Sequence, residues 1–354
     1  LATDGTPGPV VPLLDAWDAR YEFLGAVGDT FYLLTTNAAP RGRVIAVDLS
    51  APARDDWREV IPEGERVIEA AAVIGDRLVV QSIADVRTHL AIHGLDGALI
   101  RDVPLPGQGT VTGLGGIPGD PEGFFSYTDF THPRRVFRLD TATGEVRALG
   151  AAADTIDPAR FVSEQVFYPS RDGTRVPMTL VRRRDVVPDG QTPTVLYGYG
   201  GFNVALLPVY SASRMAWIEA GGIYAQANLR GGGEYGEAWH LAGTKLVKQN
   251  VFDDFIAAAA WLTGNGYTSP GHLAIWGGSN GGLLVGAVLN QRPDLFAAAV
   301  PAVGVMDMLR YHTASLNARK WSSDYGLSED PAEFAALRLE SRRAHRDDLH
   351  RIDR

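Results

Sequence analysis

The chain has 354 residues, of which 45% are hydrophobic and 21% charged; this composition excludes wholesale disorder and predicts about two globular domains. Its formal net charge of −9, from 33 Lys and Arg against 42 Asp and Glu, gives no basic surface for nucleic acid or an anionic membrane. The absence of cysteine excludes disulfides, a thiolate nucleophile and cysteine-ligated metal centres. The longest apolar stretch, Leu295 to Met306, is too short to cross a bilayer, and no signal peptide is visible, so we expect a cytoplasmic protein without a membrane anchor.

A pattern repeats in the first part of the chain. An Asp-containing turn followed by a strand occurs three times, at residues 28–35, 75–82 and, more loosely, 119–127. A second strand follows each time, and its residues Val44, Leu90 and Val136 are 46 positions apart both times. Four short strands with Gly, Asp and Pro turns fill about 40 to 50 residues, so the period predicts three blades of a partial β-propeller in residues 1–158. A β-sandwich with coincidental spacing is the alternative.

From residue 159 to the end, predicted strands alternate with predicted helices. We expect strands at residues 176–182, 194–197, 223–229, 272–276 and 297–303, and helices at 213–220, 252–263 and 281–290. Such alternation predicts a mostly parallel sheet with helices on its faces. In sheets of this kind, functional sites form at the carboxyl ends of the strands.

Two Gly-rich turns follow predicted strands and are candidates for chemistry. The first, residues 231–236, fits the G-x-G-x-x-G pattern of a dinucleotide site, with Asp253 or Asp254 about 20 residues further on. The residues after this turn have no helical apolar face, and its glutamate and nearby aromatic residues would crowd a pyrophosphate. We therefore favour a structural Gly loop with a charged anchor, and we expect no cofactor.

The second turn, residues 277–282, matches G-x-S-x-G with Ser279 at its centre. It lies between a predicted strand and a predicted helix, as a nucleophile elbow requires. There the glycines permit a strained backbone that lifts the serine hydroxyl above the sheet, and the amino end of the helix favours developing negative charge. The pattern predicts Ser279 as a nucleophile, with a plain Gly-rich loop as the alternative.

Several longer segments specify this hypothesis further. They are YGYGGFN at 197–203, NLRGGGEYG at 228–236, KQNVFDDF at 248–255, GGSNGGLLV at 277–285, QRPDLF at 291–296 and VGVMDM at 303–308. Together they resemble the prolyl oligopeptidase family from about residue 165 to 337, and the preceding repeats resemble the end of that family's seven-bladed propeller. The resemblance implies a partial α/β-hydrolase domain in residues 159–354, capped by about three blades. It also implies cleavage of short peptides after proline through an acyl-enzyme.

The resemblance also assigns roles to individual residues. Ser279 is then the nucleophile, and the Asn280 backbone N–H and the Tyr199 hydroxyl form the oxyanion hole, where one such donor contributes about 3 to 4 kcal/mol. The pocket for the substrate proline is lined by Trp321, Phe202 and Tyr325. A flat apolar pocket suits a pyrrolidine ring, which has no amide hydrogen to satisfy. We expect short proline-containing peptides as partners, no metal, and a monomer when the protein is complete.

The end of the chain departs from the family pattern. In α/β-hydrolases the triad follows the order Ser, Asp, His, and in this family both partners lie further downstream than the 75 residues that follow Ser279. Residues 338–354 are Arg-rich and off the pattern. For them we favour a charged helical tail over a substitute triad, whose candidate members are His345, His350, Asp347 and Asp348.

Three expectations follow from these departures. The chain is expected to be truncated at both ends and to leave an unpaired strand edge near residues 297–303. It is expected to have little or no peptidase activity, because the triad aspartate and histidine are missing. An esterase of the same class and a non-catalytic binding module built on the propeller blades are the alternative functions.

Overall fold

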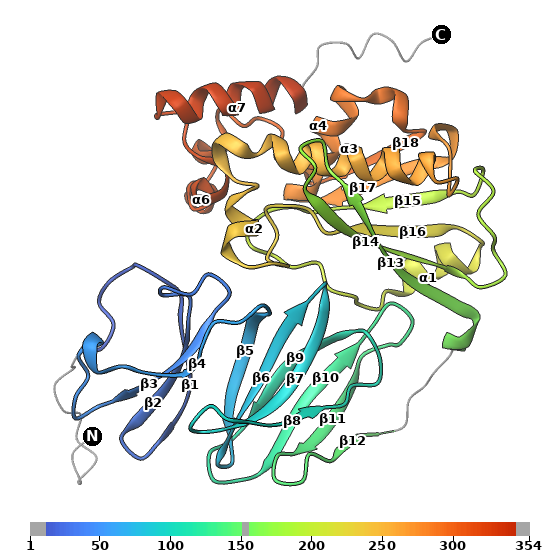
Figure 1. Ribbon diagram of the computed structural model, residues 1–354. Helices are drawn as coiled ribbons and strands as arrows, with labels where there is room; N and C mark the ends of the chain where they lie inside the picture. Colours follow the sequence, from blue (N-terminus) through green and yellow to red (C-terminus); the bar gives the residue numbers. More distant parts are fainter. Residues whose placement is uncertain (1–11, 151–155, 345–354) are drawn as a thin grey trace.

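The structure is a computed structural model that describes residues 12–150 and 156–344. Its first part consists of three four-stranded antiparallel sheets, each built from consecutive strands (Figure 1). The first sheet contains β1 (Tyr21–Val27), β2 (Thr30–Thr35), β3 (Arg43–Asp48) and β4 (Arg58–Ile61). The second contains β5 (Val67–Ile74), β6 (Arg77–Ala84), β7 (Arg87–Gly94) and β8 (Leu99–Val103). The third contains β9 (Thr110–Gly116), β10 (Glu122–Thr128), β11 (Arg135–Asp140) and β12 (Val146–Ala148).

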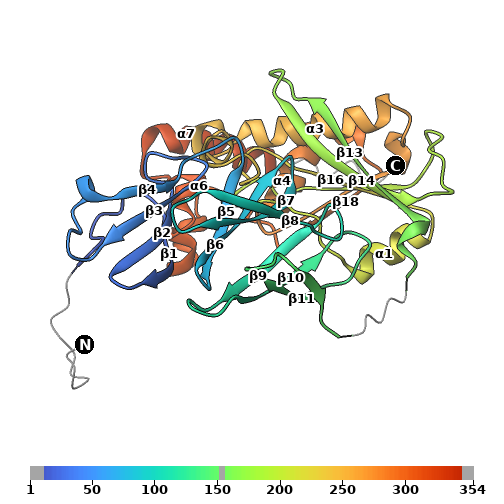
Figure 2. The same ribbon diagram turned by 60° about the horizontal axis from the view of Figure 1, so that its bottom comes forward.

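These sheets are the three predicted propeller blades. The repeats found in the sequence form the second and third strand of each blade, and Gly28 and Gly75 make the turns before the second strands at φ of 58° and 65°. Adjacent blades pack face to face through apolar side chains, such as Leu24 and Val44 of the first blade against Val73 and other residues of the second. A further cluster joins the second blade to the third. The turned view in Figure 2 shows the blades fanned out beside one another.

The second part is built on one six-stranded sheet with the strand order β13-β14-β16-β15-β17-β18. Its strands are β13 (Phe161–Pro169), β14 (Arg175–Arg183), β15 (Thr194–Tyr197), β16 (Ile223–Ala227), β17 (Leu273–Gly278) and β18 (Ala298–Ala302). The pairings β15·β16, β15·β17 and β17·β18 are parallel, whereas β13·β14 and β14·β16 are antiparallel. The predicted mostly parallel sheet is therefore confirmed, with β13 as a strand that the sequence pattern did not indicate.

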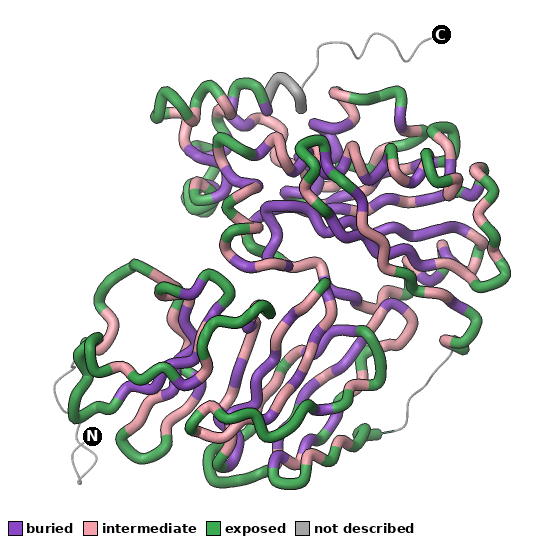
Figure 3. Tube along the Cα trace, in the orientation of Figure 1, coloured by how far each residue is buried: buried purple, intermediate pink, exposed green. Residues whose placement is uncertain are grey.

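Helices cover both faces of this sheet. They are α1 (Ala212–Glu219), α2 (Glu237–Leu241), α3 (Gln249–Gly264), α4 (Asn280–Gln291), α5 (Leu316–Arg319), α6 (Ser322–Tyr325) and α7 (Pro331–Ala344). The apolar faces of α3 and α4 bury Phe252, Phe255 and Val285 against Leu273 and Ile275 of β17, and this cluster is the main core. Figure 3 shows the buried residues concentrated in this sheet and the helices on it. On the other face, α1 packs Met215 and other residues against β14 and β16.

One detail differs from the sequence-based expectations. A short helix, α2, follows the first Gly-rich turn, where no helical face was expected. Helix α7 contains the beginning of the predicted charged tail, whereas residues 345–354, including His345, His350, Asp347 and Asp348, lie outside the described residues. The predicted open edge is observed: among the described strands, β18 pairs only with β17, and Val300 on β18 is 52% exposed.

The propeller blades and the mixed sheet are joined by specific contacts. The Thr110 hydroxyl of the third blade donates to the Pro208 carbonyl at 2.6 Å, and the Tyr210 N–H donates to the Thr128 hydroxyl at 3.2 Å. In the second blade, Val86 packs with Leu207 in a small buried cluster. None of the helices in the described ranges is long and apolar enough to span a membrane.

Candidate active site

Ser279 lies at a sharp turn between β17 and α4. Its backbone has φ 57° and ψ −116°, a conformation that costs a non-glycine residue about 1 to 3 kcal/mol. The strain is held by hydrogen bonds on both sides, because the Ser279 N–H donates to the Ala302 carbonyl at 2.9 Å and its own carbonyl accepts from Gly282 and Leu283. Ser279 is exposed, whereas Asn280 beside it is buried. This geometry is that of a nucleophile elbow.

The glycines of the turn permit close approach of backbones. A Cβ at Gly277 would overlap the Gly281 carbonyl, and a Cβ at Gly282 would lie 2.6 Å from both the Ala302 oxygen and the Gly304 Cα. A Cβ at Gly281 would lie 2.7 Å from the Gly198 oxygen. From the sequence, the glycines were expected to permit a strained backbone. In the structure the positive φ belongs to Ser279, and these glycines let β17, α4 and the neighbouring strand ends pack around it.

Replacing Ser279 with glycine is expected to stabilise the chain by about 1 kcal/mol relative to Ser279→Ala, because glycine adopts a positive φ without steric cost. Both variants remove the serine hydroxyl, so their difference isolates the backbone strain. Denaturant unfolding of the two variants measures this difference. Equal free energies of unfolding would contradict a strained elbow.

The two predicted oxyanion groups lie beside Ser279. Burial raises the pKa of the Tyr199 hydroxyl, the charge of Asp324 raises it further, and a hydrogen bond with the Ser279 side chain partly opposes both effects. Asn280 is the first residue of α4, so its backbone N–H has no acceptor within the helix. The Asn280 side chain donates to the Tyr199 carbonyl at 2.5 Å and thereby fixes the two groups relative to each other.

Aromatic side chains gather next to this pair. The Tyr325 hydroxyl donates to Asn280 Oδ1 at 3.1 Å, and the Tyr325 ring meets the Phe202 ring edge-on at 5.3 Å between centroids. Trp321 is 37% exposed and stacks on Tyr311, which in turn contacts Tyr325. The structure thus brings five of the six predicted site residues into direct contact, and Trp321 joins them through Tyr311.

The backbone of the loop that contains Tyr199 and Phe202 is hydrogen-bonded to two buried charged side chains. The sequence did not indicate either of them as a site residue. Lys248 donates from Nζ to the Gly200 carbonyl at 3.0 Å, and Asp324 accepts from the Phe202 N–H at 2.6 Å. Burial lowers the pKa of Lys248 to about 8, although the negative charges of Asp324 and Glu340 oppose that shift. Lys248 belongs to the segment KQNVFDDF noted in the sequence and Asp324 to none of the quoted segments, and only the folded chain places them under one loop.

None of the histidines in the described part of the chain is hydrogen-bonded to Ser279. Each ring that is hydrogen-bonded or ion-paired has a different partner; the pairs are His93 with Gly97, His132 with Asp129, His240 with Asp324, His272 with Ser269 and His312 with Glu329. His89 lines a hollow of the second blade. The described residues therefore place a candidate nucleophile and oxyanion groups together, without a general base beside them.

The first Gly-rich turn has a structural anchor. Arg230, directly before the turn, donates to both oxygens of Asp254 on α3 through its side chain, at 2.5 and 3.0 Å, and through its N–H at 3.1 Å. Its Nη1 donates to Asp172 at 2.6 Å, which helps to lower the pKa of Asp172 to about 2. Asp254 is thus occupied and buried, so it is not placed to bind a ribose, and the charged-anchor interpretation explains the turn.

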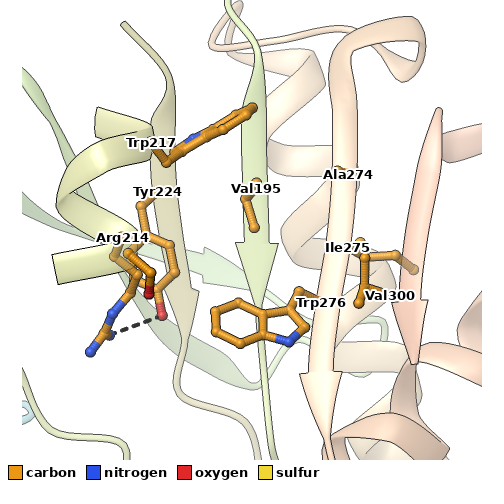
Figure 4. Close-up of a pocket in the computed structure, with 9 residues that line it drawn as sticks. Val195, Arg214, Trp217, Tyr224, Ala274, Ile275, Trp276 and Val300 are labelled. Atoms are coloured by element: carbon orange, nitrogen blue, oxygen red, sulfur yellow. Dashed lines mark hydrogen bonds between the residues drawn. The ribbon is translucent and has the colours of Figure 1, made fainter. Parts of the chain in front are cut away.

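A hollow of about 360 Å³ lies on the α1 face of the sheet (Figure 4). Its lining is mostly aliphatic and aromatic, with Val195, Ala274 and Trp276 from the sheet and Trp217 from α1. The only hydrogen bond drawn there joins Arg214 to the Tyr224 hydroxyl at 3.2 Å. None of the predicted site residues lines this hollow, so it is not the candidate active site. The described residues contain no cluster of three or more side chains that could hold a metal ion.

The fold and the elbow together define a class of protein. A mostly parallel sheet covered by helices, with an exposed serine at a strand–turn–helix elbow, is the α/β-hydrolase fold, here joined to propeller blades. The family model described as "Prolyl oligopeptidase family" matches residues 208–346, and the model of that family's N-terminal β-propeller domain matches residues 2–151. The chain belongs to the prolyl oligopeptidase family, as the sequence motifs predicted.

Individual relatives agree with this assignment. Over 324 residues the chain is 41% identical to a prolyl endopeptidase of Elizabethkingia meningoseptica, covering 92% of this chain and 46% of the relative. It is 33% identical to a dual-function macrocyclase-peptidase of Galerina marginata, covering 91% of this chain and 45% of the relative. A solved prolyl endopeptidase, studied for inter-domain dynamics in catalysis and specificity, superposes with a TM-score of 0.89 at 44% identity, covering 93% of this chain and 48% of that one. The chain thus spans about half the length of the relatives that it matches.

Proposed function

We propose that Ser279 is the nucleophile of a serine peptidase site that recognises proline-containing peptides and cleaves after proline through an acyl-enzyme. The observation that carries the proposal is the contact between Ser279, the Tyr199 hydroxyl and Asn280, with the Phe202 and Tyr325 rings directly beside them. Two hydrogen-bond donors next to an exposed serine hydroxyl suit the oxyanion that forms when a serine attacks a carbonyl. In this proposal the division between the two domains falls between β12 and β13.

Specificity in this proposal comes from the aromatic pocket. A pyrrolidine ring is flat and apolar and brings no N–H that would need an acceptor, so it can be buried against rings without an unsatisfied donor. Trp321, exposed and stacked on Tyr311, presents a face for this ring. Solved structures of a Galerina marginata prolyl oligopeptidase bound to 35-residue substrates, with TM-scores of 0.91 and 0.90 to this chain, support peptides as the substrate class.

Turnover by this chain is expected to be slow. Serine attack needs a base, and losing the base of a serine protease can cost about a million-fold in rate. The histidines of the described residues are engaged elsewhere or lie in the propeller blades. Binding should therefore be easier to detect than hydrolysis.

The decisive experiment compares two blocked dipeptide amides, acetyl-Gly-Pro-amide and acetyl-Gly-Ala-amide, by calorimetry and tryptophan fluorescence. We expect about tenfold tighter binding of the proline peptide, because stacking of an apolar ring contributes about 1 to 2 kcal/mol. Trp321→Ala should remove the difference, whereas the matched variant Trp57→Ala, in the first blade, should keep it. Ser279 should also react with a fluorophosphonate faster than Ser213 does.

Other outcomes would point elsewhere. Equal affinity for the two peptides, together with no labelling of Ser279, would overturn the proposal. Turnover of a nitrophenyl ester with no preference for proline would favour an esterase of the same class. A Ser279→Ala variant that matches the parent chain in labelling and in peptide binding would favour a non-catalytic module.

A further inference from the structure

Helix α2 lies against the propeller blades at its amino end. The Glu237 N–H, at the first position of α2, donates to the Pro40 carbonyl of the first blade at 3.0 Å. The approach is close, because a Cβ at Gly236 would lie 2.9 Å from the same oxygen. One residue earlier, the Tyr235 hydroxyl donates to Asp85 of the second blade at 2.9 Å. The start of α2 is therefore tied to two blades.

One helical turn further on, α2 reaches the candidate active site. His240 Nε2 lies 3.2 Å from Asp324 Oδ2, so the ring N–H donates to the carboxylate. The other oxygen of Asp324 accepts from the Phe202 N–H at 2.6 Å. Both side chains are largely buried, at 14% and 3% exposure, so water competes little for these hydrogen bonds. A continuous series of contacts thus leads from Pro40 to the backbone of the aromatic pocket.

The backbone at the end of this series is one that needs support. Phe202 and Asn203 both have positive φ, at 57° and 56°, and each such residue costs about 1 to 3 kcal/mol. Their conformation persists only while surrounding contacts hold it, and the Asp324 hydrogen bond is one of the shortest of those contacts. Other supports include the Asn203 N–H bonded to the Gly231 carbonyl at 3.1 Å and Lys248 bonded to Gly200.

We propose that α2 couples propeller contact to the shape of the proline pocket, with His240 and Asp324 as positioning residues for Phe202. Contact of Pro40 with Glu237 fixes the helix, the helix fixes His240, and His240 holds Asp324 in the orientation that accepts the Phe202 N–H. The use of proline peptides to read out the pocket rests on the proposed function above. The geometry of the loop itself can be measured without it.

A single substitution can remove the hydrogen bond between α2 and the first blade. Glu237→Pro removes the N–H that contacts Pro40, and proline is well tolerated at the first position of a helix, so α2 itself is retained. Glu237→Ala is the matched control, because it removes the side chain and keeps the N–H. At the other end, His240→Ala removes the donor to Asp324, whereas His240→Gln keeps a side-chain N–H and should restore the contact.

Two readouts on the full chain decide the proposal. The first is amide hydrogen exchange in residues 199–206, with residues 273–278 as the internal reference. We expect Glu237→Pro and His240→Ala to speed exchange in residues 199–206 about tenfold, the effect of losing one hydrogen bond to a charged group. The second is the preference for acetyl-Gly-Pro-amide over acetyl-Gly-Ala-amide, which should fall by a similar factor. Glu237→Ala and His240→Gln should match the parent chain in both measurements.

Unchanged exchange in residues 199–206 of both Glu237→Pro and His240→Ala would overturn the coupling, even if the parent chain prefers proline. A parent chain without that preference would overturn the proposed function instead, and the exchange rates would still decide the coupling. If circular dichroism shows that Glu237→Pro loses helical content, the comparison of His240→Ala with His240→Gln tests the coupling without it. Faster exchange that also affects residues 273–278 would mean general loosening and count against a positioning role.

Discussion

Replacing Arg230 with methionine is expected to lower the free energy of unfolding by about 3 to 5 kcal/mol, because the substitution leaves Asp254 buried without its counter-charge. The side chains of Arg230 and Asp254 are 5% and 0% exposed, so water cannot replace the lost partner. Ser170 donates to the same carboxylate at 2.5 Å, but a hydroxyl carries no charge to compensate it. This group joins the end of β13, the end of β16 and α3, and its loss should loosen all three.

The expected loss depends on pH in a defined direction. Burial already raises the pKa of Asp254, and the Arg230 hydrogen bonds oppose that shift. Without Arg230 the carboxyl group should bind a proton at higher pH in the folded chain than in the unfolded one. Protonation then favours folding, so Arg230→Met should cost less at pH 5 than at pH 8.

Denaturant unfolding at the two pH values measures both effects. Arg160→Met is the matched control, because Arg160 pairs with Glu219 at the surface, with side-chain exposures of 51% and 33%, and such pairs contribute about 1 kcal/mol or less. Arg230→Lys should recover only part of the lost stability, since the ammonium group of lysine cannot make the bidentate hydrogen bonds of a guanidinium with a carboxylate. A cost below that of the Arg160 variant would refute the role assigned to this ion pair.

The sequence predicted the elements whose signals are local. A Gly-Asp turn precedes the second strand of each blade, and the third strands, marked by Val44, Leu90 and Val136, repeat at a spacing of 46 residues. The first and fourth strands have no such mark; β8 (Leu99–Val103), for example, is exposed along most of its length. Strands of this kind form because the neighbouring strand offers hydrogen bonds, and that information lies elsewhere in the chain.

Part of the candidate site could likewise be predicted from the sequence. Ser279 stands in a pattern with a defined strand–turn–helix context, and the aromatic residues around it were inferred from a family resemblance. The support beneath the loop was not predictable, because His240, Lys248 and Asp324 come from three segments that only the tertiary structure brings together. Histidine and lysine occur at many positions of a sequence. The role of each one depends on the side chain or backbone group that the fold places beside it.

The second large effect is expected at Glu234, because its carboxyl group is buried. It lies in the first Gly-rich turn and is 1% exposed. Its Oε1 accepts from the Leu206 N–H at 2.9 Å and from Asn228 at 3.0 Å, whereas its Oε2 has no partner. The negative charge of Glu69 on β5 of the second blade also acts on it.

The sign of the pH effect follows from this environment. Burial, with a contribution from Glu69, raises the pKa of Glu234 to about 7, against about 4.3 in an unfolded chain. Between these values the folded chain keeps a proton that the unfolded chain has released. Stability is therefore highest at the low end of this window and falls as pH rises through it, by about 3 kcal/mol in total, before levelling off above about pH 7.

Glu234→Gln should remove this dependence, because an amide cannot lose a proton in this range. The amide also carries no charge that would have to be buried. We expect the variant to match the parent chain near pH 5 and to be about 2 to 3 kcal/mol more stable at pH 8, measured by denaturant unfolding. Glu237→Gln, a partly exposed carboxylate in the following helix, is the control and should not change the pH profile. Parallel profiles for Glu234→Gln and the parent chain would mean that Glu234 is ionised in the folded chain and that its surroundings accommodate the charge.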